Sequence, residues 1–164
     1  MAIPSRHADP GRVLSNARTF FVTSSIQGKR SLLQSDRSAR LFIEVVYEYR
    51  GQSKCQLHEF VVMPDHFHLL LTVGEISVER AVQLVKGGFA YRAGKTLGFK
   101  APVWQKGFSE VRVIDGKAYE NQRRYIHNNP VERHLAVRAE EYPYSSAHSG
   151  FELDPPPQGL KPVS

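Results

Sequence analysis

Runs of apolar residues divide the chain into seven predicted elements, and the spacing within each run distinguishes strands from helices. Four runs are short and rich in β-branched and aromatic residues, which is typical of strands: Thr19–Ser25, Cys55–Met63, His66–Val73 and Glu110–Ile114. Three longer segments repeat apolar residues at helical intervals: Asp36–Gly51, a segment that begins after Ser77, and Lys117–Asn129. Pro130 should end the third helix, because proline lacks the backbone N–H that continues one.

These elements follow the order strand, helix, strand, strand, helix, strand, helix. The first six match the ferredoxin-like, split βαβ arrangement, in which two helices cover one face of an antiparallel sheet. We therefore predict an α+β sandwich of this type, with the third helix as an addition packed against the sheet or its helices. The folded domain should span residues 19–151, between a flexible arm at 1–18 and a Pro-rich, irregular tail at 152–164.

The third predicted strand contains two histidines, His66 and His68, on either side of Phe67. Side chains alternate along a strand, so both imidazoles point to the same side, about 6.6 Å apart along the backbone. Phe67 and the leucines that follow point the other way, which makes theirs the core face and leaves the histidines on an exposed face. Two imidazoles placed in this way are natural metal ligands. The alternative is a solvated or hydrogen-bonded pair at the edge of a hairpin.

The third predicted helix places Tyr125 and Asn129 on one face, because they are one helical turn apart. Tyr125 supplies a phenol, and Asn129 an amide oxygen that can coordinate a hard cation. Gln122 lies one turn earlier on the same face. Both residues also have ordinary structural explanations, in which Tyr125 is a core aromatic and Asn129 is the C-terminal cap before Pro130.

Charge gives the first indication of a partner. Lysine and arginine number 22 against 16 acidic residues, a net charge of +6 and a pI of about 9.6, and basic surfaces attract nucleic acid. Five residues of the second and third predicted helices are candidate contacts for DNA phosphates: Lys86, Arg92, Lys95, Arg123 and Arg124. Each is equally explained as part of a solvated helix face. Trp104 and Phe108 either stack on unpaired bases or fill the core.

Composition excludes other classes of protein. Cys55 is the only cysteine, which excludes an internal disulfide framework and a Cys-rich zinc site and favours a reducing cytoplasm. No run approaches the roughly 18 consecutive apolar residues of a membrane helix. Residues 1–10 lack the apolar segment of a secretory signal. We therefore expect a cytoplasmic protein without a membrane partner.

Several stretches resemble one known family. Val61–Leu71, which reads VVMPDHFHLLL, resembles the His-hydrophobe-His signature of the single-tyrosine HUH transposases. The stretches Trp104–Phe108 and Arg124–Val131 are similar to the region of that family's catalytic helix, and Tyr142–Ser146 fits its usual downstream motif. The motifs occur in the family's order between about Phe20 and Ser146, and they are most similar to the REP-associated tyrosine transposase branch. The resemblance makes residues 19–151 a single HUH transposase catalytic domain.

The resemblance also implies residue roles: metal ligands His66 and His68, nucleophile Tyr125, and Asn129 as the polar residue that completes the metal site. Because this donor set mixes nitrogen and oxygen and leaves positions open, it suits Mg²⁺ or Mn²⁺ better than zinc. The family cuts single-stranded DNA beside a small hairpin, such as a REP-like palindrome. It leaves a 5′-phosphotyrosine and a free 3′-hydroxyl that can reverse the reaction. Such a protein acts as a monomer or a homodimer.

Three other functions remain open from sequence. A replication initiator or relaxase shares this chemistry but usually carries further domains. A non-catalytic module that binds single-stranded DNA or RNA would show aromatic residues on the exposed strand face, where this chain has His66 and His68. A domesticated, inactive relative is a third alternative. Asp65 is interpreted as a turn residue rather than a base, and structural roles are expected for His58, Tyr119, His127 and His148.

Overall fold

The computed structural model describes residues 17–162. It contains the strands β1 (Arg18–Ser25), β2 (Gln56–Met63), β3 (His66–Val73) and β4 (Ser109–Val113). The helices are α1 (Asp36–Gly51), α2 (Val78–Leu97) and α3 (Gly116–Glu132), and single 3-10 turns cover Gln27–Lys29 and Ala139–Glu141. Each predicted strand and helix is therefore present, with small shifts at the ends. The predicted N-terminal arm lies outside the described residues except at its last two positions.

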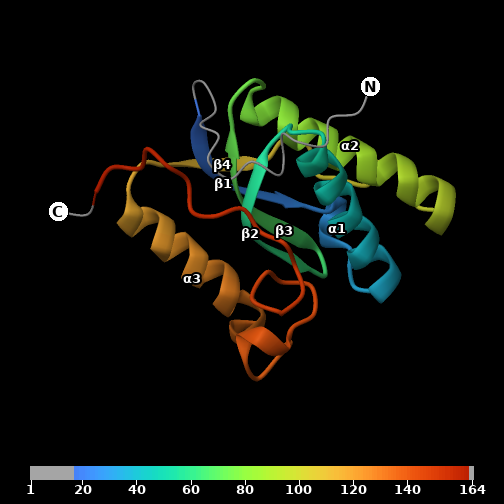
Figure 1. Ribbon diagram of the computed structural model, residues 1–164. Coiled ribbons are helices and arrows are strands. Elements are labelled where there is room, and N and C mark those ends of the chain that lie inside the picture. The colour runs from blue at the N-terminus through green and yellow to red at the C-terminus, as the bar shows by residue number, and fades with distance from the viewer. Residues whose placement is uncertain (1–16, 163–164) are drawn as a thin grey trace.

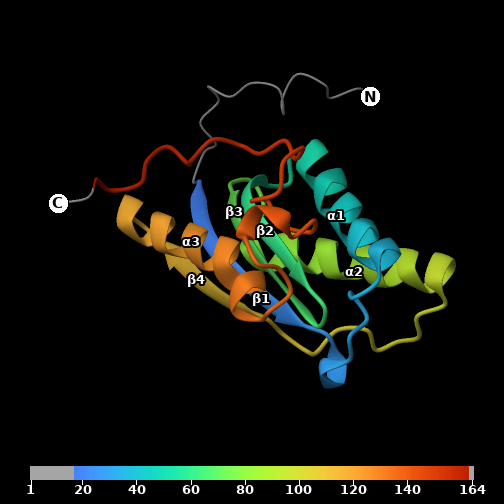
Figure 2. The ribbon, with the colours of Figure 1, turned by 90° about the horizontal axis from the view of Figure 1, so that it is seen from below.

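The strands form one antiparallel sheet in the order β2-β3-β1-β4. This order, with α1 between β1 and β2 and α2 between β3 and β4, is the ferredoxin-like arrangement, so the predicted fold class is confirmed. Helices α1 and α2 lie on one side of the sheet and α3 on the other (Figures 1 and 2). The additional helix thus turns a two-layer sandwich into three layers.

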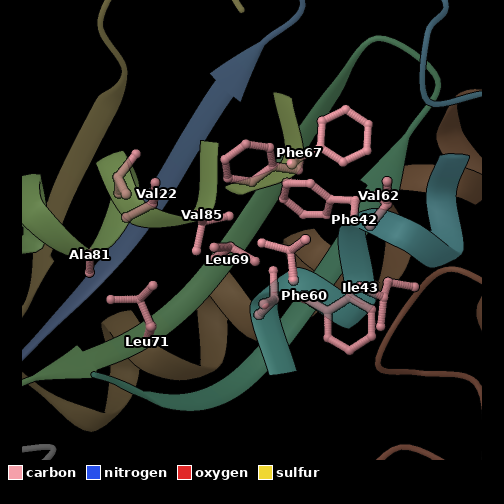
Figure 3. Packing of buried hydrophobic residues seen from close by; sticks show 14 of the residues in the cluster. Val22, Phe42, Ile43, Phe60, Val62, Phe67, Leu69, Leu71, Ala81 and Val85 are labelled. Carbon is pink, nitrogen blue, oxygen red and sulfur yellow. The ribbon is translucent and has the colours of Figure 1, made fainter. Parts of the chain in front are cut away.

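The layer between the sheet and α1 and α2 is the main apolar core (Figure 3). Alternation along β3 sends Phe67, Leu69 and Leu71 to this side, where all three are almost fully buried. Phe67 packs against Phe42 of α1 with ring centroids 4.6 Å apart, and Phe42 in turn meets Phe89 of α2 at 5.7 Å. Burying a side chain of this size contributes about 1.5–3 kcal/mol, so this layer supplies most of the stability.

The opposite face of the sheet is covered by α3, which corrects the expectation that His66 and His68 lie on an exposed face. Their exposed fractions are only 6% and 4%. Phe21 and Leu70 of the sheet pack with Ile126 of α3 in a second, smaller apolar cluster, and this packing draws the helix over the histidines. Strand periodicity indicates the side to which a residue points, but it cannot indicate what packs on that side.

Helix α3 continues past Pro130 to Glu132, so the predicted end of this helix was wrong. Proline removes only the one hydrogen bond that its own nitrogen would donate, and here that position falls in the last turn. The Arg133 N–H donates to the Asn129 carbonyl at 3.1 Å, and the Leu135 N–H donates to the Pro130 carbonyl at 2.8 Å. These bonds close the last turn of α3 and place Arg133 at its C-terminal cap.

The chain after α3 returns along the β2 edge of the sheet. The Val62 N–H donates to the Tyr144 carbonyl at 2.8 Å, and the Ser146 N–H donates to the Phe60 carbonyl at 2.9 Å. Further on, the Asp154 carboxylate accepts the Leu57 N–H at 2.7 Å and pairs with Arg50. Residues 151–162 form no helix or strand, yet they are tied to the domain by these bonds. Among the described helices, none is long and apolar enough to cross a membrane.

Candidate active site

The histidine pair lies on β3, which pairs with β1 at the centre of the sheet. His68 lies opposite Thr23, and His66 lies opposite Ser25. The Pro64–Asp65 turn joins β2 to β3 immediately before His66. The pair therefore sits at the end of the sheet where this hairpin closes, on the side that faces α3, with its ring centroids 4.9 Å apart.

Hydrogen bonds to the Nδ1 atoms orient both imidazoles. The His66 Nδ1–H donates to the Asp65 carboxylate at 2.6 Å, and the Nδ1 of His68 lies 2.7 Å from the Thr23 hydroxyl oxygen. The Asn129 side-chain nitrogen lies 3.4 Å from the Nε2 of His68, and in the tautomer whose Nδ1–H donates to Thr23 this Nε2 is unprotonated and accepts from it. Both histidines thus present an unprotonated Nε2, which is the form that binds a metal.

Asn129 completes a third side of this site. Its side chain is 3% exposed, and its Oδ1 has no hydrogen-bond partner within residues 17–162. An unpaired buried carbonyl oxygen costs about 1–3 kcal/mol, so a ligand or water that bonds to it would stabilise the site. Half a turn of the amide would exchange this oxygen with the nitrogen that now faces His68. The donor set of two imidazole nitrogens and one amide oxygen fits a divalent cation such as Mg²⁺ or Mn²⁺.

No three His, Cys, Asp or Glu side chains come together as a metal cluster in the described part of the chain. A zinc site of the closed, four-ligand type is therefore unsupported there. The neutral side chain beside the two histidines that could add an oxygen donor is Asn129.

Burial keeps the two histidines neutral. It is the largest influence on His68 and, together with the charges of His66 and Arg133, lowers its pKa to about 3. Burial also lowers the pKa of His66, and the adjacent Asp65 carboxylate raises it by less. Burial alone would raise the pKa of the Asp65 carboxyl. The hydrogen bond from His66 and the charge of Lys29 outweigh burial, so this pKa is below its usual value. No proton has to leave either imidazole when a cation binds at neutral pH.

Tyr125 stands at the rim of the buried pair. Its ring meets His68 edge to face with centroids 5.3 Å apart, and it meets Phe21 in the same way at 5.8 Å. Phe21 stacks flat on His68 at 5.2 Å, so the three rings form one group. Tyr125 nevertheless remains 45% exposed. Its ring is held by packing, while a large part of the residue stays open to a substrate.

Two cations beside the pair were missed in the sequence. Arg133 is on the same face of α3 as Tyr125 and Asn129, one turn beyond Asn129, and its charge acts on both histidines. Lys29 follows β1 and acts on Asp65 and His66. Helical spacing could have added Arg133 to the predicted face, which ended at Asn129 because the helix was expected to stop at Pro130. Nothing local could have indicated Lys29.

The five candidate phosphate contacts fall into two groups on opposite sides of the sheet. Arg123 and Arg124 flank Tyr125 on α3, whereas Lys86, Arg92 and Lys95 belong to α2 (Figure 2). Most already have partners in the protein: Arg123 pairs with Glu120 at 3.0 Å and Arg92 with Glu44 at 3.2 Å. Their role in DNA binding stays a prediction, and only the α3 pair lies near the histidines.

Trp104 packs against the core, which is one of the two roles predicted for it; the other was stacking on unpaired bases. Its ring packs on Phe67 and Phe42, and its indole N–H donates to the Lys86 carbonyl at 2.9 Å. The Lys86 ammonium in turn donates to the Gly107 carbonyl at 2.7 Å. A pocket of about 320 Å³ opens here between α2 and the 104–108 segment, with Trp104 and Phe108 in its wall. It lies on the α2 side, away from Tyr125.

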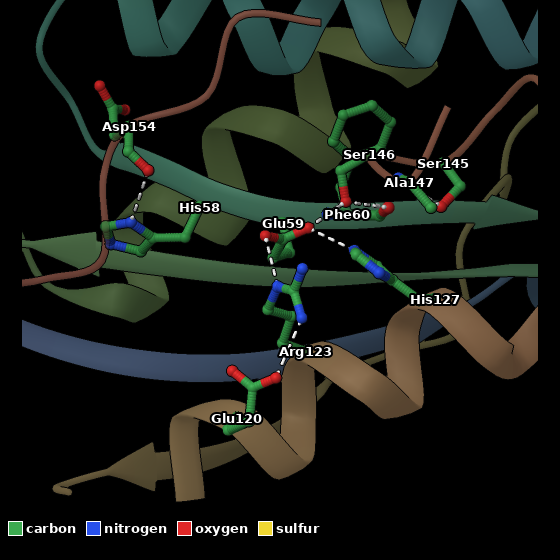
Figure 4. Close-up of polar contacts among 10 residues, drawn as sticks. All are labelled: His58, Glu59, Phe60, Glu120, Arg123, His127, Ser145, Ser146, Ala147 and Asp154. Atoms are coloured by element: carbon green, nitrogen blue, oxygen red, sulfur yellow. Dashed lines mark hydrogen bonds and ion pairs between the residues drawn. The ribbon is translucent and has the colours of Figure 1, made fainter. Parts of the chain in front are cut away.

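A second polar cluster is structural (Figure 4). The Glu59 carboxylate of β2 accepts from His127 of α3 and from the Ser146 hydroxyl, each at 2.7 Å, and lies 3.5 Å from Arg123. Burial alone would raise the pKa of Glu59, but these partners outweigh burial, so the pKa is below its usual value. The cluster joins β2, α3 and the returning chain, so it holds α3 over the histidines. His58 is likewise buried in the sheet, as its expected structural role requires.

The family model for IS200-like transposases matches residues 18–129, about two thirds of the chain. The matched stretch includes both histidines, Tyr125 and Asn129. This chain belongs to the IS200-like transposase family. The transposase has no match among curated proteins.

Two solved structures share the fold. A REP-associated tyrosine transposase bound to a REP hairpin is 19% identical, with a TM-score of 0.70 over 93% of this chain and 96% of that one. A putative transposase from Deinococcus radiodurans R1 is 21% identical, with a TM-score of 0.54 over 72% of this chain and 95% of that one. The predicted similarity to tyrosine transposases is therefore confirmed in family and in fold.

Proposed function

We propose that this transposase cuts and rejoins single-stranded DNA beside a hairpin, through a covalent bond between Tyr125 and a 5′-phosphate. One observation carries the proposal: the Tyr125 ring rests on His68, beside the buried Asn129 oxygen that lacks a partner. A nucleophile, two neutral imidazoles and an amide oxygen thus converge at one place. His66, His68 and Asn129 would hold a divalent cation, Mg²⁺ or Mn²⁺.

The reaction is a transesterification. The Tyr125 oxygen loses its proton and bonds to phosphorus, while the bond from phosphorus to the 3′ oxygen breaks and that oxygen takes up a proton. The energy of the phosphodiester is kept in the phosphotyrosine, so a 3′-hydroxyl can reverse the step without an external energy source. When bound by these residues, a divalent cation would neutralise charge on the scissile phosphate.

The protein's own groups orient these partners. Asp65 and Thr23 hold the two imidazoles in one tautomer, which keeps each Nε2 directed away from the strand. Phe21 and His68 both pack against the Tyr125 ring, at interplanar angles of 85° and 77°. The open rim gives a DNA strand access to the phenol, whereas the histidines below are shielded from water.

The substrate is inferred from charge and from a structural neighbour. The net charge of +6 favours a polyanion, and a structural neighbour was solved with a REP hairpin. A hairpin with a single-stranded flank offers a phosphodiester that is free of duplex stacking. The rival binding module would need an open sheet face with aromatic residues, but α3 covers that face.

The test is to incubate the protein with hairpin-tailed single-stranded oligonucleotides and Mn²⁺, and to look for a covalent protein–DNA band. We expect the band with the unmodified protein and with the Tyr91→Phe control, whose tyrosine lies on α2 and is 68% exposed. We expect none with Tyr125→Phe. Mass spectrometry of the digested complex should find the adduct on Tyr125. An adduct on another tyrosine, or normal cleavage by Tyr125→Phe, would contradict the proposal.

A further inference from the structure

The segment that follows α3 exposes two apolar side chains between basic residues. Val137 is 86% exposed, the highest value among the large apolar residues of the described chain, and Leu135 is 44% exposed. Arg133 and His134 precede them, and Arg138 follows. Single exposed apolar residues are ordinary on protein surfaces. Two of them close together, with basic residues on both sides, form a small patch that packing within the fold does not account for.

The segment is held in one conformation at its start. His134 adopts φ 61°, in the left-handed region that costs a non-glycine residue energy. Its N–H donates to the Val131 carbonyl at 3.1 Å, and the Leu135 N–H donates to the Pro130 carbonyl at 2.8 Å. This pair of bonds is the Schellman closure of a helix. Leu135 is therefore directed outward by the end of the same helix that carries Tyr125.

The other end is held as well. The Glu141 carboxylate accepts the Arg138 N–H at 3.1 Å and pairs with its guanidinium at 3.2 Å. Ala136, between the two exposed residues, packs against the apolar cluster beneath α3. Leu135 and Val137 are thus held out by a segment that is anchored before, between and after them.

Arg133 links this segment to the site. It continues the helical face of Tyr125 and Asn129, and its N–H bonds to the Asn129 carbonyl. Its guanidinium has no hydrogen bond or ion pair to any residue between 17 and 162, although it is exposed. A free cation beside a phosphate-cleaving site and two apolar side chains beyond it match the alternating phosphate and base of an unpaired strand.

We propose that Arg133, Leu135 and Val137 form a strand-guiding surface, on which Arg133 binds a phosphate of the single-stranded flank and the two apolar side chains contact its bases. The proposal rests on the proposed function, because it assumes a single-stranded DNA substrate. It assigns the flank, rather than the hairpin stem, to the C-terminal end of α3.

Binding is measured in the Tyr125→Phe background, so that cleavage does not intervene, by the anisotropy of a labelled hairpin oligonucleotide with a single-stranded flank. Arg133→Gln should weaken binding about tenfold and reduce the salt dependence of log K by about one. Leu135→Ser with Val137→Ser should weaken binding about fivefold or more and leave the salt dependence unchanged. Arg37→Gln on α1 and Ile114→Ser, whose isoleucine directly follows β4 and is 49% exposed, are the matched controls and should bind as the parent does.

A fluorescent base analogue in the flank reports the apolar contact directly. Its emission should change on binding to the parent and change less with the double serine variant, while Arg133→Gln should keep the change at saturating protein. Affinities within twofold of the parent for both variants would overturn the strand-guiding surface and leave the proposed function standing. Failure of the unmodified protein to bind or cut such DNA would overturn both.

Discussion

The two faces of the sheet are built from the same strands but hold different kinds of side chain. On β3, Phe67 and Leu69 enter the core beneath α1 and α2, whereas His66 and His68 face α3. The first face is closed by apolar packing alone. The second combines a small apolar cluster with polar groups, one of which has no partner in the described chain. Most apolar packing is on one face and the proposed site is on the other, so substitutions on the two faces should have separable effects.

Removing a proposed metal ligand should give the largest effect on function. His68→Ala takes away one of two imidazoles, so cleavage of hairpin DNA should fall by about 10³-fold or more, because the cation's charge neutralisation is lost. Binding of the same DNA should be largely kept, since it rests on phosphate contacts elsewhere. Cleavage assays and anisotropy measure the two effects. His148→Ala, outside the sheet, is the control, and retained cleavage by His68→Ala would contradict the assignment.

The matching change on the other face should act on folding instead. Phe67→Ala removes a fully buried ring that touches Phe42 and Trp104. We expect the free energy of unfolding to fall by about 3–5 kcal/mol, measured by urea denaturation. Tyr125→Phe should lower it by no more than about 1–2 kcal/mol, because only one oxygen is removed. Similar losses of unfolding free energy in Phe67→Ala and Tyr125→Phe would contradict the proposed difference between the two faces.

Thr23 tests whether the α3 face depends on orientation as well as on ligands. Thr23→Val keeps the shape of the side chain but removes the hydroxyl that holds the His68 Nδ1–H. Metal affinity should fall by about 10- to 100-fold, as it does when second-layer partners of ligating histidines are lost. Titration calorimetry with Mn²⁺ measures this. The matched control is Thr96→Val on α2, whose hydroxyl donates to the Arg92 carbonyl of its own helix, and it should leave metal affinity unchanged.

The smallest expected effect concerns pH. Burial lowers the pKa of His58, whose ring nitrogens bond to the Thr72 hydroxyl and the Asp154 carbonyl. In the unfolded chain, His58 has a pKa of about 6.5 and binds a proton at a pH where the folded chain keeps it neutral. The free energy of unfolding should therefore decrease as pH falls below that value. His58→Gln should lose part of this decrease, in urea denaturation followed from pH 7.5 to 5.5. An unchanged pH dependence would show that His58 does not contribute.

Much of the site could be predicted because its spacing is local. Alternation along a strand placed His66 and His68 on one side, and helical spacing placed Tyr125 one turn before Asn129. Thr23 could not be predicted, because it reaches His68 only through the pairing of β1 with β3. Arg133 was not assigned to the site, because the helix was expected to end before Pro130, whereas it continues to Glu132 and Arg133 caps it.

The sequence by itself determined the order of the elements and the ferredoxin-like class, and it placed His66 with His68, and Tyr125 with Asn129, on common faces. These follow from backbone geometry and side-chain type, which act over a few residues. Only the tertiary structure decided that α3 covers the histidines, that Thr23 and Asp65 fix their tautomers, and that one Asn129 oxygen is left without a partner among the described residues. Those outcomes depend on which surfaces bury one another, and residues far apart in the chain meet only after that packing is complete.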